Sequence, residues 1–519
     1  MDTKWFFPKI GVLTRETWSQ TLAGGSEFET GNGTLKVVNA SEIDGRMFLD
    51  GERVSARAGG TIDAIDPATA EVFAKVALGD KADVDAAVAS AQAAMGSWAG
   101  LAPVRRVRLL NRLAGLLREH SRELAELESL DVGKPLRQAE DDVAAAAGYF
   151  EYFAGVADKV FGSSIPLGQG YVDFTLREPL GVSAQIVPWN YPLRLASRGI
   201  APALACGNAV VAKPAAEAGL SIIRLAELAV EAGLPPGVFN VVTGGRETGA
   251  ALASHAGINH ITFTGSVPTG IAIMKAAADN VVPVTLELGG KSPNIVFADA
   301  DLERAAASAA TTLMQNSAQT CTAPTRLLLE APAHDRFVEL LATRIGTIRL
   351  GRGLDNPDMG PVVSERQMQR VLGFIAAGLK DGARAVAGGR RADGAGRNRG
   401  FFIEPTLLDQ VAPGTELGQE EIFGPVLTVT TFGSVDEAIA VANGTPYGLV
   451  TGVWTRDLSR ALTVAMAVKS GQVRVNSYSV EGSIGLPFGG YKRSGFGREQ
   501  GVEALANYTQ VKNVMINFG

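Results

Sequence analysis

The segment Thr285-Leu286-Glu287-Leu288-Gly289-Gly290-Lys291 places a carboxylate inside an apolar strand that ends at two glycines. Farther along, Asn316-Ser317-Ala318-Gln319-Thr320-Cys321 places a cysteine in a run of small, mostly polar residues. A carboxylate held among leucines is partly desolvated, which favours its neutral form and suits a base working near neutral pH. A thiolate is a strong nucleophile when its pKa is lowered or a donor stabilises it. The two segments predict a base and a nucleophile at the ends of two different elements.

The chain has two cysteines, and they differ in their surroundings. A lone cysteine usually behaves as a small buried apolar residue. Cys206, in Ala203-Leu204-Ala205-Cys206-Gly207, fits that description. The neighbours of Cys321 are mainly polar, so a buried apolar niche is not expected for it. With two cysteines a disulfide framework is excluded, which favours a reducing compartment and a cytoplasmic protein.

Short apolar runs alternate with helical patterns on both sides of Glu287. The predicted strands are 182–187, 209–212, 239–242, 260–263 and 284–288, then 294–297 and 326–329. The predicted helices between them are 192–205, 220–232, 247–255 and 268–278, then 301–314 and 334–345. This alternation predicts a parallel, doubly wound α/β sheet followed by a second α/β unit, with the boundary near Gly289-Gly290. Such sheets bind ligands at the carboxyl ends of their strands.

The two motifs resemble those of the aldehyde dehydrogenases that oxidise aldehydes to acids with NAD or NADP. The resemblance runs from about Met47 to the C-terminus. It implies a small-molecule aldehyde substrate, thiohemiacetal and thioester intermediates, and a homodimer or homotetramer. It also implies an α/β fold with a Rossmann-like cofactor domain over residues 46–160 and 179–288, a catalytic domain over 289–490, and a β oligomerisation arm over 161–178 and 491–519. Residues 1–45 are an N-terminal extension outside the resemblance.

The arm rests on two segments, 171–177 and 507–514, that alternate like two-sided strands. Open edge strands invite pairing with another chain, as the resemblance implies for this arm. The alternative is a hairpin folded onto its own chain. An aromatic stripe on the helix predicted over 141–160 indicates core packing, because helical spacing puts its members on one face: Tyr149, Phe150, Tyr152 and Phe153.

The resemblance implies three catalytic residues. Cys321 attacks the aldehyde, and the side-chain amide of Asn190 with the Cys321 N–H holds the oxyanion that forms. The alternative for Asn190, in Val187-Pro188-Trp189-Asn190-Tyr191-Pro192, is a helix cap. Glu287 activates the water that releases the acid. Relatives that pass the acyl group to coenzyme A typically lack a base there, so a coenzyme-A-acylating enzyme is the nearer alternative and a non-catalytic binding protein the other.

The predicted dinucleotide site is assembled from several segments. Lys213 resembles the lysine that contacts the adenosine ribose, and Phe263-Thr264-Gly265-Ser266 leads into a helix whose N-terminus suits a pyrophosphate. Glu421 and Phe423 resemble the pair that holds the nicotinamide ribose and ring, the alternative for Glu421 being a solvated loop acid. The remaining predicted contacts are Ile186, Pro188, Trp189, Gly245, Gly249, Leu288 and Gly289.

Two departures from the family pattern concern specificity. NAD-preferring members usually carry a glutamate three residues after the lysine, where this chain has Ala216 followed by Glu217, so NADP is expected to be accepted. Arg198 stands where semialdehyde dehydrogenases hold the substrate carboxylate, although Gln315 replaces their partner arginine. A structural ion-pair partner is an equal alternative for Arg198. The predicted substrate contacts are Arg198, Tyr191 and Gln315, and positional guesses add Arg194, Thr320, Thr322, Tyr478 and Ser483.

The composition fits this interpretation. The 519 residues are 46% hydrophobic and 20% charged, which is typical of a globular enzyme. A formal charge of −6 without a basic cluster argues against a nucleic-acid partner. No apolar run approaches the roughly 18 residues of a membrane span. The four histidines show no metal-ligand spacing, so no metal is predicted.

Overall fold

The structure, a computed structural model, describes residues 43–519 apart from 395 and 479–482. Of the extension predicted over residues 1–45, all but the last three residues lie outside the described part. Both cysteines are free thiols. Within the described residues, no helix combines the length and the apolar character needed to cross a membrane.

An eight-stranded sheet has the strand order β19-β11-β10-β7-β8-β9-β1-β2. Its strands are β1 (Met47–Leu49), β2 (Glu52–Val54), β7 (Val182–Val187), β8 (Ala209–Pro214), β9 (Phe239–Val241), β10 (His260–Thr264), β11 (Val284–Glu287) and β19 (Gly495–Phe496). The five strands from β11 to β9 are parallel, as their apolar runs predicted. Antiparallel strands lie at both edges.

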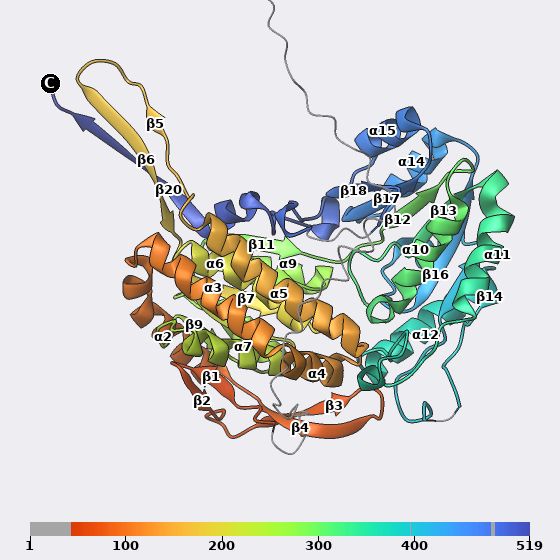
Figure 1. The fold of residues 1–519 in the computed structure, drawn as a ribbon, viewed down its shortest axis with the longest axis horizontal. Coiled ribbons are helices and arrows are strands. Elements are labelled where there is room, and N and C mark those ends of the chain that lie inside the picture. The colour runs from red at the N-terminus through yellow and green to blue at the C-terminus, as the bar shows by residue number, and fades with distance from the viewer. Residues whose placement is uncertain (1–42, 395, 479–482) are drawn as a thin grey trace, which may run out of the picture. The chain divides into compact units, whose positions relative to one another are not determined.

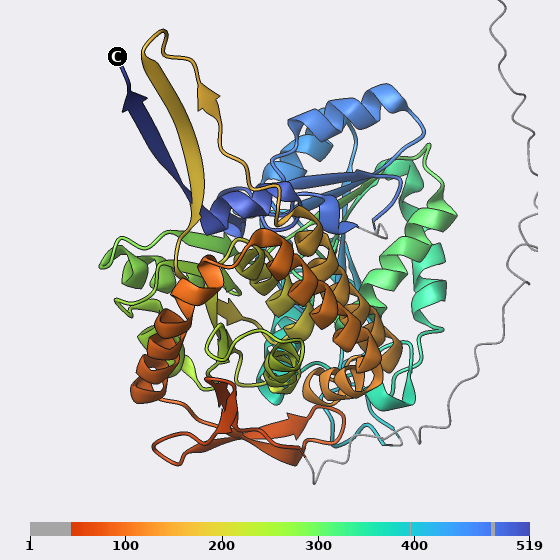
Figure 2. The same ribbon diagram turned by 60° about the vertical axis from the view of Figure 1, so that its left-hand side comes forward.

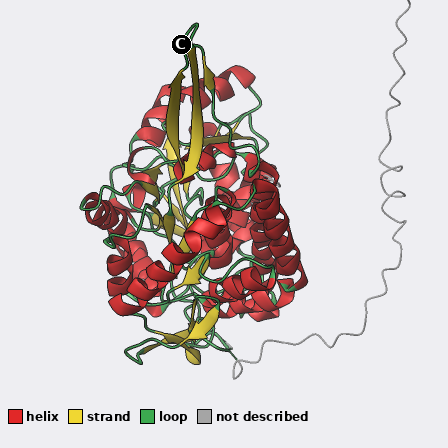
Figure 3. Ribbon diagram, turned by 90° about the vertical axis from the view of Figure 1, so that its left-hand side faces the viewer, coloured by secondary structure: helices red, strands yellow, loops and turns green. Residues whose placement is uncertain are grey.

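Helices cover both faces of this sheet, as Figure 3 shows for the whole body. They are α2 (Lys81–Ala99), α3 (Pro103–Glu119), α4 (Ser121–Val132), α5 (Leu136–Val156), α6 (Pro192–Ala205), α7 (Leu220–Glu231), α8 (Arg246–Ala253) and α9 (Val267–Ala278). Alternate residues of β8 enter different cores: Val210 and Ala212 pack with α3, α5, α6 and α7, while Ala209 and Val211 pack with α2 and α8. A strand buried on both faces needs a continuous apolar run, which explains its sequence.

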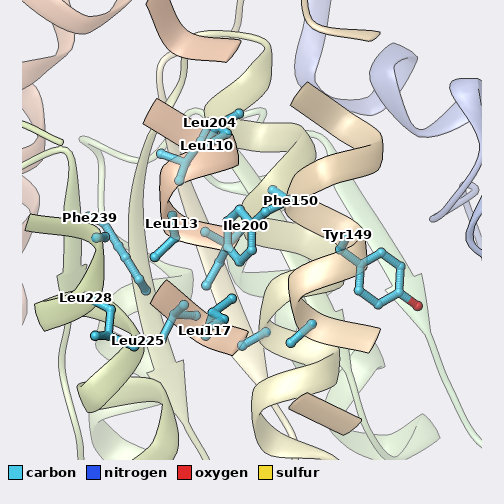
Figure 4. Packing of buried hydrophobic residues seen from close by; sticks show 14 of the residues in the cluster. Leu110, Leu113, Leu117, Tyr149, Phe150, Ile200, Leu204, Leu225, Leu228 and Phe239 are labelled. Carbon is cyan, nitrogen blue, oxygen red and sulfur yellow. The ribbon is translucent and has the colours of Figure 1, made fainter. Parts of the chain in front are cut away.

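Figure 4 shows the larger of these two cores, where leucines of α3 and α7 pack against Phe239, Ile200 and Phe150. The predicted aromatic stripe on α5 contributes three buried rings, Tyr149, Phe150 and Phe153. Tyr149 is also on the wall of the cavity described below, so it does more than fill the core. Fully burying a side chain of this size stabilises the fold by about 1.5–3 kcal/mol.

A second, seven-stranded sheet has the order β14-β15-β16-β13-β12-β17-β18. Its strands are β12 (Pro293–Val296), β13 (Arg326–Glu330), β14 (Arg384–Ala387), β15 (Thr406–Asp409), β16 (Val426–Phe432), β17 (Val450–Trp454) and β18 (Gln472–Val475). Its helices are α10 (Leu302–Met314), α11 (His334–Ile345), α12 (Glu365–Lys380), α13 (Glu416–Gln419), α14 (Val435–Asn443) and α15 (Leu458–Ala467). All pairs are parallel except β14 with β15. The second α/β unit is therefore present.

A three-stranded sheet projects from the body in Figures 1 and 2. Its strands are β5 (Ser164–Ile165), β6 (Tyr171–Pro179) and β20 (Thr509–Asn517), and a separate hairpin joins β3 (Thr61–Asp66) to β4 (Glu71–Ala77). β6 and β20 pair with each other along their whole length within the chain. The segment 491–519, predicted as arm, is not all arm: β19 adds to the first sheet beside β11.

Candidate active site

The strand registers place the predicted residues at one edge of the first sheet. Phe263 pairs with Ile186, Ile186 pairs with Lys213, and Thr264 pairs with Glu287. These residues are the last or last but one of four neighbouring parallel strands, at the carboxyl edge where doubly wound sheets bind ligands. Segments far apart in the chain therefore meet at one level of the sheet.

The side chains at this edge fit a dinucleotide. Lys213 is buried, and burial lowers its pKa to about 8, with the nearby Glu217 carboxylate opposing that shift. A Cβ placed on Gly249 would lie 3.9 Å from the Lys213 chain, so the glycine keeps the space beside the lysine open. Ser266 is the N-cap of α9, whose first backbone N–H groups suit a phosphate. A cation and a helix N-terminus at the same edge of the sheet are donors that a ribose and a pyrophosphate can use.

Glu421 reaches the glycines that follow β11. Its carboxylate accepts a hydrogen bond of 3.0 Å from the Gly290 N–H, and burial raises its pKa to about 7. The solvated-acid alternative is therefore wrong. Phe423, close by, packs edge-on against Trp189 with ring centroids 5.3 Å apart.

The two glycines after Glu287 are required by close approach. A Cβ on Gly289 would lie 2.4 Å from a Glu421 carboxylate oxygen, and a Cβ on Gly290 would lie 2.5 Å from the Cys321 carbonyl oxygen. Both distances are far below van der Waals contact. The glycine pair therefore lets the cysteine loop and Glu421 pack directly on the end of β11.

The backbone before Cys321 adopts an unusual conformation. Asn316, Ser317 and Ala318 have φ values of 48°, 54° and 55°, a left-handed turn of three consecutive residues other than glycine. Such a conformation costs roughly 1–2 kcal/mol per residue, so surrounding contacts must hold it. The Asn316 N–H donates to the Gln138 side chain at 2.8 Å, and the Ser317 hydroxyl donates to the Gly360 carbonyl at 2.8 Å. These contacts give the segment that carries the thiol one defined shape.

Asn190 is held beside the thiol by the same segment. Its side-chain amide nitrogen donates to the Gln319 backbone carbonyl at 3.0 Å. Its backbone carbonyl accepts a hydrogen bond from the Asn316 side-chain amide at 2.7 Å. The N-cap of α6 is Tyr191, and the Leu193 N–H in the first turn of that helix donates to the Glu128 carboxylate at 3.0 Å, not to Asn190. The cap alternative for Asn190 is therefore wrong, and both Asn190 and Cys321 line one cavity.

Glu287, Arg198 and Glu499 form a buried charged cluster. The Glu287 carboxylate is 2% exposed and has no hydrogen-bond partner among the described residues. Burial, followed by the nearby Glu499 carboxylate, raises the pKa of Glu287 well above its usual range, while Arg198 opposes this. Arg198 forms an ion pair with Glu499, which supports its structural alternative. Its contact with a substrate carboxylate stays a prediction.

Burial also governs the thiol. It raises the pKa of Cys321 to about 12, and the positive charge of Arg198 opposes the shift. Burial therefore disfavours the thiolate, and a higher pH favours it. Burial raises the pKa of Cys206 to about 12 as well, but Cys206 does not line the cavity that Cys321 lines.

A cavity of about 440 Å³ lies beside Cys321. The three predicted substrate contacts, Tyr191, Arg198 and Gln315, line it, as do four of the residues guessed from position: Arg194, Thr320, Thr322 and Tyr478. The side chain of Ser483 lies outside the described residues. Glu287 is not among the described residues that line this cavity.

Sequence reasoning missed several residues of the site. Glu499 reaches Glu287 only because β19 pairs with β11, and a glycine-rich segment carries no local signal of that pairing. Lys291 is fully buried, its ammonium has no hydrogen-bond partner among the described residues, and burial lowers its pKa to about 7. The sequence signal that could have identified Lys291 is its position directly after Gly289 and Gly290. Arg304 and Arg474, on the cavity wall, were not predicted either.

The comparisons with known proteins agree with this geometry. The model of the aldehyde dehydrogenase family matches residues 54–514. A hydroxyisobutyraldehyde dehydrogenase of Mycolicibacterium austroafricanum is 44% identical, with 91% of this chain and 93% of that protein covered. A solved P. syringae indole-3-acetaldehyde dehydrogenase with NAD+ and IAA is 42% identical, covers 98% of this chain and 100% of its own, and has a TM-score of 0.89. A Staphylococcus aureus betaine aldehyde dehydrogenase with NAD+ is 38% identical, with 92% and 96% covered and a TM-score of 0.90.

Proposed function

Because the chain belongs to the aldehyde dehydrogenase family and oxidises aldehydes with a nicotinamide cofactor, we propose that Cys321, Asn190 and Glu287 carry out the reaction. The observation that carries the assignment is the shared cavity of the thiol and the Asn190 amide, with the buried carboxylate close enough to alter the thiol's pKa. Cys321 is the nucleophile, Asn190 an oxyanion donor and Glu287 the base.

The first step joins the substrate to the enzyme. The Cys321 sulfur bonds to the aldehyde carbon, the thiol proton leaves to solvent, and the carbonyl oxygen becomes an oxyanion. The Asn190 amide, which donates to the Gln319 carbonyl in the structure, turns its N–H toward this oxygen together with the Cys321 N–H. Donors placed in advance stabilise such charge by about 3–4 kcal/mol each.

The second step leaves the acyl group on Cys321 as a thioester. A nicotinamide cofactor, when bound, would accept the hydride that the thiohemiacetal carbon loses. Lys213, the first turn of α9, and Glu421 with Phe423 are the residues that would hold the cofactor there. Glu287 then takes a proton from water, the hydroxide adds to the thioester carbon, and the Cys321 thiolate leaves as the acid forms.

The test is reduced-nicotinamide formation with short aliphatic, long aliphatic, aromatic and carboxylate-bearing aldehydes, each with NAD and with NADP. We expect turnover with NAD, a free acid as product, and no requirement for coenzyme A. NADP is expected to be accepted as well, because Ala216 brings no carboxylate and the Glu217 charge is paired with Arg366 at 2.9 Å. Absence of NADP turnover at saturating cofactor contradicts the second expectation. Cofactor binding without oxidation of any aldehyde contradicts the proposed roles.

We also propose that the enzyme is a homodimer or homotetramer of the cytoplasm. The arm exposes apolar side chains on β6 and β20, among them Val172, Leu176, Val511 and Met515. β20 is an edge strand whose outer side has no partner strand among the described residues. Exposed apolar edges of this kind favour association. Light scattering is expected to give a multiple of the chain mass, and Met515→Lys to lower it; a monomeric parent protein contradicts this proposal.

A further inference from the structure

The cavity beside Cys321 has a one-sided charge. Among its described lining residues are four arginines and no aspartate or glutamate: Arg194, Arg198, Arg304 and Arg474. The whole chain carries a net charge of −6, so this concentration of positive charge is local. A cleft lined by one sign of charge attracts the opposite sign.

Two of the four arginines are already neutralised by carboxylates of the protein. Arg198 forms its ion pair with Glu499, and both side chains are almost completely buried. Arg194 lies 3.4 Å from a carboxylate oxygen of Asp142. Neither of these two guanidinium groups has an uncompensated charge for a ligand.

The other two arginines have only neutral partners among the described residues. Arg304 donates to the Asn476 carbonyl at 3.5 Å. Arg474 donates to the side-chain oxygen of Gln472 at 2.9 Å and to the carbonyl of Tyr478. No described carboxylate lies within salt-bridge distance of either group, in contrast to Arg194 and Arg198.

The two groups converge from different elements. Arg304 lies in the first turn of α10, and Arg474 lies on β18, two residues before the carbonyl that Arg304 contacts. Both elements belong to the same half of the molecule in Figure 1. Arg304 is exposed and Arg474 partly buried, so they line the solvent-accessible part of the cavity.

We propose that Arg304 and Arg474 form an anion subsite that binds the carboxylate of an aldehyde carrying an acidic group at its far end. This assignment rests on the proposed function and specifies its substrate class. Guanidinium groups suit this task because they bind carboxylates with charge-assisted hydrogen bonds. Arg304 lies in the first turn of α10 and Gln315 directly follows its last residue, and both line the cavity; the helix rises about 16 Å between them, so this wall is long enough for an extended substrate. Longer ω-oxo acids should therefore gain more than short ones.

The test compares matched aldehydes that differ in the terminal carboxylate. Adipic semialdehyde is paired with hexanal, and succinic semialdehyde with butanal. The parent enzyme is expected to prefer adipic semialdehyde over hexanal, with a smaller preference in the shorter pair. Arg304→Gln and Arg474→Gln should each lower kcat/KM for adipic semialdehyde about 10- to 100-fold, the usual range for a lost charged hydrogen bond, and change hexanal by less than about twofold. Arg105→Gln, on the exposed surface of α3, is the control and should change neither.

Equal losses with both aldehydes, or a parent enzyme without preference for the acidic one, would overturn the subsite. If the parent enzyme oxidises neither hexanal nor the acidic aldehydes, the proposed function is overturned instead. A measurement on the parent enzyme alone avoids any folding defect: adipate is expected to inhibit hexanal oxidation competitively, more strongly than hexanoate, and less at high salt. Equal inhibition by adipate and hexanoate also contradicts the subsite.

Discussion

Replacing Cys321 with alanine is expected to lower the rate of aldehyde oxidation by a factor of about a thousand or more. Losing the nucleophile removes the whole covalent route, and enzymes lose activity on this scale when it is deleted. The side chain is small and partly buried beside a cavity, so the fold should survive. Reduced-nicotinamide formation measures the loss, and binding of NAD by fluorescence should be unchanged.

Cys206→Ala is the matched control for this variant. Burial raises the pKa of its thiol to about 12 as well, but Cys206 lies in the core at the C-terminal end of α6 and does not line the cavity beside Cys321. Its activity should stay within about twofold of the parent, with a small loss of stability from the missing sulfur contact. Retention of more than about a hundredth of the activity in Cys321→Ala, or an equal loss in Cys206→Ala, contradicts the nucleophile assignment.

Replacing Glu287 with glutamine is expected to stop the reaction after one turnover. The amide has the same shape but takes no proton, so the thioester forms and is hydrolysed about a hundredfold to ten-thousandfold more slowly. Rapid mixing should then show a burst of about one reduced nicotinamide per active site, followed by a slow phase. A variant that loses the burst as well places Glu287 before hydride transfer and contradicts its role as the base for hydrolysis.

The pH dependence gives the same assignment a second readout. The pKa of Glu287 is raised by burial and by Glu499, so its basic form increases as pH rises through that raised value. The hydrolysis rate of the parent should rise with pH over that range, and this rise should be absent in Glu287→Gln. Glu499→Gln removes one cause of the shift and frees the charge of Arg198, so the rise should move to lower pH. An unchanged profile in Glu499→Gln contradicts the coupling.

Local patterns in the chain were enough to predict most elements, and the resemblance of two motifs to a known family implied the chemistry. The five apolar runs predicted β7 to β11 because each run is buried on both faces of a parallel sheet, and such a strand must be apolar throughout. The segments around Glu287 and Cys321 could be recognised because their packing restricts which residues fit there. The chain packs closely at the end of β11, and side-chain contacts hold the segment that carries the thiol. Gly289 and Gly290 show this, since a Cβ at either position would collide with Glu421 or Cys321.

Contacts between segments distant in the sequence determined the features of the site that local patterns did not predict. The left-handed turn before Cys321 depends on Gln138 and Gly360, and no propensity of Asn316 or Ser317 predicts three such residues in succession. The ion-pair partner of Arg198 could not be named from the sequence, because Glu499 reaches it only through the pairing of β19 with β11. The sequence shows which side chains are charged, but tertiary packing decides which of them pair with each other. It therefore also decides which charges remain available to a ligand.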